Sequence, residues 1–166
     1  MTFKIDQRVV YPAFGVGQIV GKVSKRFFEA QLLDYYEIVN DRSTVWVQVH
    51  DAVAKGLRAL TRQDELANYR EVLGGRPVGL NQDARQRQAD FHGQLRRYTM
   101  QDLCEMVRDL SARGWSKPLG EYDASGLRKS RIGLCQEWAV ADGISIIEAN
   151  AEVDRLLLTA RQTYQT

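Results

Sequence analysis

Apolar and polar residues alternate with a period of two along much of the first sixty residues. The alternation is clearest over residues 44–49, where valine occupies every second position. Residues 35–39 are aromatic and β-branched, as strands prefer. Residues 9–11 form a strand that Pro12 ends, because proline removes a hydrogen-bond donor from the ladder. Short strands at this spacing predict a small, sharply bent β-barrel of the SH3 or Tudor kind.

From residue 61 onward the apolar positions recur with the period of a helix. Residues 61–64 resemble a capping box, and the apolar stripe behind them stops at Gly74-Gly75. Further helices are predicted over residues 82–97, from residue 99 to Gly114, from about residue 123 to Gly143, and onward from Ser145. The sequence therefore predicts an α+β protein, with a barrel domain over residues 1–60 and a compact five-helix domain over residues 61–166.

The segment between the first two predicted helices contains Pro77 and two adjacent glycines. We interpret residues 74–80 as a linker that lets the angle between the domains vary. Trp138 lies on the apolar stripe of its helix and is predicted to be a core residue, whereas Trp115 follows Gly114 in a predicted loop.

Composition limits the classes of function. The chain has 166 residues, of which 44% are hydrophobic and 27% charged, and its formal net charge is only +2. A chain of this composition folds, but a net charge this small does not by itself indicate a nucleic-acid-binding protein. The two cysteines, Cys104 and Cys135, are predicted to be buried, reduced thiols of a cytoplasmic protein. No stretch resembles a signal peptide or a membrane span.

Motifs of catalysis and of metal binding are not found in the sequence. The two histidines, His50 and His92, have no cysteine or carboxylate at metal-ligand spacing. No phosphate-binding loop and no nucleophile elbow is present. We therefore expect a binding protein rather than an enzyme, with no metal and no cofactor. A catalytic site assembled in space from distant residues is a remote alternative.

Several short sequence motifs occur together in a characteristic order. They resemble those of the CarD/CdnL family of bacterial RNA polymerase-binding transcription regulators, whose N-terminal module also occurs in transcription-repair coupling factors. The matching motifs are Phe3-Lys4, Val9-Val10-Tyr11-Pro12, Gly15-Val16-Gly17, Tyr35-Tyr36, residues 45–49, Ala52 and Gly56-Leu57-Arg58. In the fourth helix the residues that fit the family pattern Ala-Arg-x-x-Leu-x-x-Glu-x-Ala are Arg131, Leu134, Glu137, Ala139 and Ala141, with Ser130 in place of the first alanine.

The resemblance implies that the Tudor-like barrel binds the β subunit of RNA polymerase through an exposed strand edge, by β-augmentation. The residues it points to here are Lys25, Arg26, Phe28, Val45, Trp46 and Val47. Lys25 retains a basic residue of the family pattern, whereas Trp46 replaces one. Trp46 is either a residue that packs within the domain or, if it faces outward, an anchor of the interface.

The resemblance also implies contact between the helical domain and promoter DNA. In the family a tryptophan wedges into the minor groove at the upstream edge of the transcription bubble. Asp83 stands at that position here, and a carboxylate is repelled by phosphate. Arg85, Arg87 and Lys129 match basic positions and are the candidate phosphate ligands.

Together these observations predict a cytoplasmic transcription regulator, associated with the nucleoid through RNA polymerase, that contacts promoter DNA weakly and without sequence choice. Whether it activates or represses stays open. The alternative is a protein-interaction adaptor whose helical domain has no role at DNA.

Overall fold

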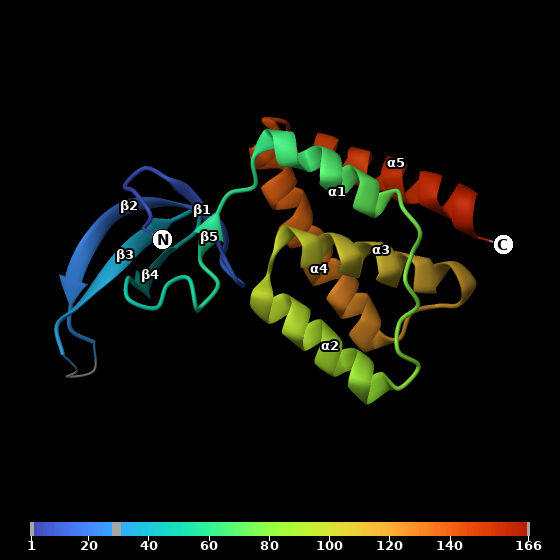
Figure 1. Ribbon diagram of the computed structural model, residues 1–166, viewed down its shortest axis with the longest axis horizontal. Helices are drawn as coiled ribbons and strands as arrows, with labels where there is room; N and C mark the ends of the chain where they lie inside the picture. The colour runs from blue at the N-terminus through green and yellow to red at the C-terminus, as the bar shows by residue number, and fades with distance from the viewer. Residues whose placement is uncertain (1, 28–30, 166) are drawn as a thin grey trace. The chain divides into compact units, whose positions relative to one another are not determined.

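The fold is α+β, as the sequence predicts. The computed structural model describes residues 2–27 and 31–165 (Figure 1). The chain divides into two compact units, residues 1–60 and residues 61–166. A five-stranded antiparallel sheet forms the first unit, and five α-helices form the second.

The sheet has the strand order β4-β3-β2-β1-β5. Its strands are β1 (Arg8–Tyr11), β2 (Gly15–Lys25), β3 (Leu33–Val39), β4 (Thr44–Gln48) and β5 (Arg58–Ala59). Over the described residues the sheet is open, because β4 pairs only with β3 and β5 only with β1. β5 has two residues and reaches only the β1 edge, so the predicted closure into a barrel is not seen.

One face of this sheet carries the core of the unit. Alternate residues of the strands point into it, among them Val9, Ile19, Tyr36, Ile38 and Val47, all of which are buried. The register of β2 against β3 shifts between Ile19 and Gly21. A bulge of this kind bends the strand and increases its twist, which lets a small sheet curve around a small core.

Gly17 is required where β2 comes close to β3 and to the preceding turn. A Cβ atom at this position would lie 2.7 Å from Cγ2 of Ile38 and 2.9 Å from the ring of Phe14. Gly17 is therefore explained by close packing at the start of β2, where a side chain would not fit.

The second unit contains a short 3₁₀ turn (Gln63–Glu65) and five helices. These are α1 (Leu66–Leu73), α2 (Ala84–Arg97), α3 (Met100–Ser116), α4 (Glu121–Asp142) and α5 (Ile146–Tyr164). Side chains of Asp83, Thr99 and Ser145 cap α2, α3 and α5 by accepting backbone N–H bonds.

Two predicted details of the helices are wrong. α3 does not end at Gly114 but continues to Ser116, so Trp115 lies in its last turn. The predicted capping box at residues 61–64 lies one residue later, where the Arg62 amide donates to the Glu65 carboxylate at 2.9 Å. The hydroxyl of Thr61 is directed elsewhere and donates to Glu137.

Residues 74–80 do not connect the two units. They join α1 to α2 within the helical unit, and the Val78 amide there donates to the Asp109 carboxylate at 3.0 Å. The boundary between the units instead falls between Leu60 and Thr61. The Leu60 amide donates to the carbonyl of Arg8 in β1, whereas the amide and hydroxyl of Thr61 donate to Glu137 of α4 at 3.1 and 2.6 Å. Consecutive residues are thus held by different units.

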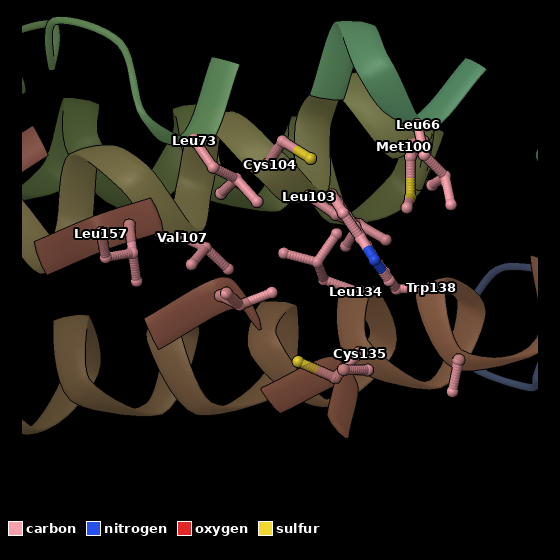
Figure 2. Close-up of a cluster of buried hydrophobic side chains, with 13 residues drawn as sticks. Leu66, Leu73, Met100, Leu103, Cys104, Val107, Leu134, Cys135, Trp138 and Leu157 are labelled. Carbon is pink, nitrogen blue, oxygen red and sulfur yellow. The ribbon is translucent and has the colours of Figure 1, made fainter. Parts of the chain in front are cut away.

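The main core of the helical unit is built by α1, α3, α4 and α5 (Figure 2). Trp138 is fully buried in it beside Leu103 and Leu134, which confirms its prediction as a core residue. α2 packs separately, through Phe91 against Met106 and Leu110 of α3. Cys104 and Cys135 are buried free thiols, also as predicted.

Within the described part of the chain, no helix is both long enough and apolar enough to cross a membrane.

Candidate protein and nucleic-acid interface

Trp46 lies on the face of the sheet opposite the core. Its neighbours Val45 and Val47 both contact the core, so the alternation along β4 turns the indole to the other side. Glu37 is its cross-strand partner on β3, and the indole Nε1 donates to the Glu37 carboxylate at 3.0 Å. The tryptophan is therefore held in place on the outer face of the sheet and remains partly exposed there.

Other aromatic and basic side chains surround Trp46 on this outer face. The Lys25 ammonium lies 4.1 Å from the centre of the indole ring, within the range of a cation–π interaction. Phe27 lies 6.3 Å from the same ring and 5.1 Å from the ring of Tyr35, against which it packs edge to face. We call Lys25, Phe27, Tyr35, Glu37 and Trp46 the outer-face cluster. It combines a large apolar contact area with one positive and one negative group.

The outer-face cluster borders an open edge of the sheet. β4 is the last strand on that side, so the edge it does not share with β3 has no strand partner among the described residues. The side chains of Val45 and Val47 pack toward the core, and only the backbone of these two residues is offered at the edge. Arg26 is exposed beside Lys25, and Phe28 lies outside the described residues.

Asp83 caps a helix. Its carboxylate accepts the amide of Arg85 at 3.2 Å, and its own amide donates to Asn81 at 2.9 Å. This arrangement starts α2, and it explains why an acidic residue is favourable at the position where the family resemblance expects a tryptophan.

Arg87 is buried and bound within the helical unit. Its Nε donates to Asp123 at 3.1 Å, and Nη1 donates to the carbonyl of Asn81 at 2.9 Å. Arg113 approaches the other oxygen of the same carboxylate at 3.2 Å. Because this guanidinium is buried and already hydrogen-bonded to Asp123 and Asn81, Arg87 is a poor phosphate ligand.

Arg85 and Lys129 differ from Arg87 in exposure. Both side chains are solvent-exposed, Arg85 on the first turn of α2 and Lys129 in the middle of α4. Neither forms an ion pair with a described residue. They remain candidate phosphate ligands.

Sequence reasoning missed the structural roles of the matched residues in α4. Glu137 is buried and accepts both hydrogen bonds from Thr61, while Ser130 is buried and donates to the carbonyl of Gly126 at 2.8 Å. Arg131 binds Asn150 and Asp154 of α5. The signal that could have shown this is the presence of a glutamate and a serine on the apolar stripe of α4, because buried polar groups need hydrogen-bond partners.

Among residues 2–27 and 31–165, no group of three or more His, Cys, Asp or Glu side chains is arranged to hold a metal ion. No family model matches this sequence, and no curated protein matches it. The function of the chain therefore has to be inferred from its residues and their geometry.

Proposed function

We propose that this protein is a non-enzymatic transcription regulator of the CarD/CdnL kind, whose sheet unit binds the β subunit of RNA polymerase. The observation that carries the proposal is the outward orientation of Trp46 beside the open edge of β4. A partner strand that adds to β4 would form main-chain hydrogen bonds at the edge and bury the outer-face cluster at the same time. We also propose that the sheet unit is a bent sheet of the Tudor kind.

Trp46 is suited to act as the anchor of such an interface. Tryptophan contributes a large buried area on binding, and here its rotamer is fixed in advance by Glu37 and Lys25. A side chain that is already ordered loses less conformational entropy when a partner covers it. Lys25 and Arg26 add positive charge at the same end of the sheet.

The helical unit would then act at the promoter complex through weak contacts to the DNA backbone. Arg85 and Lys129 are the proposed phosphate ligands, and neither reads sequence. No wedge is expected from Asp83, since its carboxylate is exposed and caps α2. Binding to the polymerase would place the protein at the nucleoid.

A second candidate is a protein-interaction adaptor whose helical unit does not touch DNA. The sequestration of Arg87 by Asp123 favours it, because this ion pair removes one of three candidate phosphate ligands. Footprinting of a promoter complex at low and at moderate salt separates the two candidates. Protection at the upstream edge of the bubble at low salt supports DNA contact, and no protection at either salt supports the adaptor.

Direct binding to the isolated lobe of the polymerase β subunit tests the proposal. We expect the full chain to bind and Trp46→Ala to raise the Kd by about tenfold or more, as loss of an interface anchor does. Tyr122→Ala is the matched control, because Tyr122 is an exposed aromatic residue of the helical unit. It should leave the Kd unchanged.

Circular dichroism and urea unfolding of each variant keep the test independent of stability. If the folded wild-type protein does not bind the β lobe, the proposal fails. It also fails if Trp46→Ala lowers stability while the folded fraction binds with the original affinity.

A further inference from the structure

A groove of about 390 Å³ lies between α4 and α5. Its apolar lining comes from Ile132 and Cys135 of α4 and from Ile146 in the first turn of α5. Gln136 and Asn150 supply amide groups at its wall. The volume is enough for one or two large apolar side chains.

The isoleucines around this groove are unusually exposed for residues of their kind. The exposed fraction is 59% for Ile132, 45% for Ile146 and 78% for the adjacent Ile147. None of them belongs to the core clusters of the helical unit. Exposed apolar groups that gather at a groove are typical of a surface that another molecule covers.

The border of the groove is positively charged. Arg128 and Lys129 precede Ile132 by four and three residues, so both lie on the same face of α4, one turn earlier. Arg128 is 3.7 Å from Glu121, but that carboxylate is 93% exposed and neutralises it only weakly. The N-terminus of α5 adds a partial positive charge on the other side.

The acidic groups near the groove are already engaged. Asp154 binds Arg131, and Glu148 closes the capping box of α5 with Ser145. An occupant would therefore meet an apolar floor and, at the border, the positive charges of Arg128 and Lys129, of which Arg128 is neutralised only in part by Glu121.

We infer that this groove binds an acidic amphipathic helix of a partner protein. Apolar side chains one turn apart would fill the space between Ile132 and Ile146, and carboxylates beside them would face Arg128 and Lys129. A second copy of this chain fits less well. A two-fold dimer through the groove would bring the same arginine and lysine of both copies together. The inference stands independently of polymerase binding.

The test uses the full chain and two designed peptides of about 18 residues, long enough to form a helix on binding. Both carry leucine at positions i, i+3, i+4 and i+7. In one peptide the positions flanking this stripe are glutamate, and in the other they are lysine. We expect saturable binding of the glutamate peptide, with shifts of the Ile132 and Ile146 methyl resonances in NMR spectra and none for Ile5.

Two variants locate the site. Ile132→Glu should weaken binding of the glutamate peptide about tenfold or more. The matched control is Ile5→Glu in the sheet unit, because Ile5 is 57% exposed, and it should bind as the wild type does. Arg128→Glu should weaken the glutamate peptide and improve binding of the lysine peptide.

Several outcomes would overturn the inference. They are absence of saturable binding, equal affinity for the two peptides, or equal loss in Ile132→Glu and Ile5→Glu. Self-association of the wild type that Ile132→Glu abolishes, seen by analytical ultracentrifugation, would assign the groove to a second copy and also overturn it.

Discussion

Asp83 shows how one carboxylate can fix the start of a helix. The family resemblance expects a large apolar side chain there, whereas this carboxylate caps α2. Asp83→Trp would remove the cap and cost about 1 kcal/mol of helix stability. A side chain at this position can cap α2 or act as an apolar wedge, but it cannot do both.

A side chain at Gly133 would force the ring of Tyr98 to move. An added Cβ would lie 2.2 Å from the hydroxyl oxygen of Tyr98 and 3.0 Å from the ring carbon that carries it. Gly133→Ala should therefore destabilise the protein by about 1–3 kcal/mol, as overpacking does, although alanine is the better helix former. Urea unfolding measures the change.

Gly93→Ala is the control for this prediction. Gly93 also lies inside a helix, and a Cβ there would meet only the end of the Arg97 side chain at 3.6 Å. This substitution should be neutral or should stabilise the protein by up to about 1 kcal/mol. Equal effects of the two substitutions would contradict the packing argument.

Because of the two buried thiols, the free energy of unfolding should change with pH in the alkaline range. Burial raises the pKa of Cys104 well above its ordinary value of 9.0, and the charge of Glu137 adds to the effect. Burial also raises the pKa of Cys135. In the unfolded chain both thiols ionise above about pH 9 while the folded state keeps them protonated, so the free energy of unfolding should fall as pH rises beyond that value.

The measurement is urea unfolding between pH 7 and 10, compared with the Cys104→Ala/Cys135→Ala variant, whose loss of stability over the same interval should be smaller. At pH 8 the native thiols should resist a disulfide reagent and react once urea unfolds the chain. Fast reaction of the native protein would contradict the prediction.

At the scale of elements, the sequence predicts the periodic structure well and its ends less well. The strands and all five helices follow the apolar periodicity, because burial of one face decides the type of element. The sequence predicts the end of α3 at Gly114, which is two residues too early, because Gly114 keeps a helical backbone. Lys117, which precedes Pro118, is extended and ends the helix instead.

α2 is joined to α4 by a buried ion pair. Asp123 of α4 accepts Arg87 of α2 and also faces Arg113 of α3, and the three side chains are largely buried. Asp123→Asn leaves two buried guanidinium groups without a carboxylate, and we expect a loss of about 3–5 kcal/mol in the free energy of unfolding. Chemical denaturation provides the value.

Asp154→Asn is the comparison for this ion pair. Asp154 binds Arg131 at the surface, where its carboxylate is largely exposed, and the loss should stay within about 1 kcal/mol. Should Asp123→Asn cost no more than Asp154→Asn, the ion pair would not be what joins α2 to its neighbours.

For the molecule as a whole, the proposed phosphate ligands Arg85 and Lys129 predict how DNA binding would depend on salt. Arg85→Ala and Lys129→Ala should each lower the slope of log K against log salt by about one, because each would remove one proposed phosphate contact. Affinity would be measured on a promoter fragment bound by polymerase. Arg42→Ala, an exposed arginine in the turn between β3 and β4, is the control and should leave the slope unchanged.

The candidate site could be predicted from the sequence only in part. The alternation along β4 placed Val45, Trp46 and Val47 on one strand, but the direction of the indole depends on which face of the sheet is buried. That face is set by long-range packing of residues such as Phe3 and Leu57. The ion pair between Arg87 and Asp123 could not be predicted either, because it also depends on long-range packing and its partners are 36 residues apart in the sequence.

The boundary at residues 60 and 61 also determines where the protein can be divided. A fragment that begins at Thr61 keeps both donors for the carboxylate of Glu137, whereas a fragment that begins at Arg62 leaves that carboxylate buried without them. A chimera that exchanges the sheet unit for another therefore has one favourable joint, the peptide bond between Leu60 and Thr61.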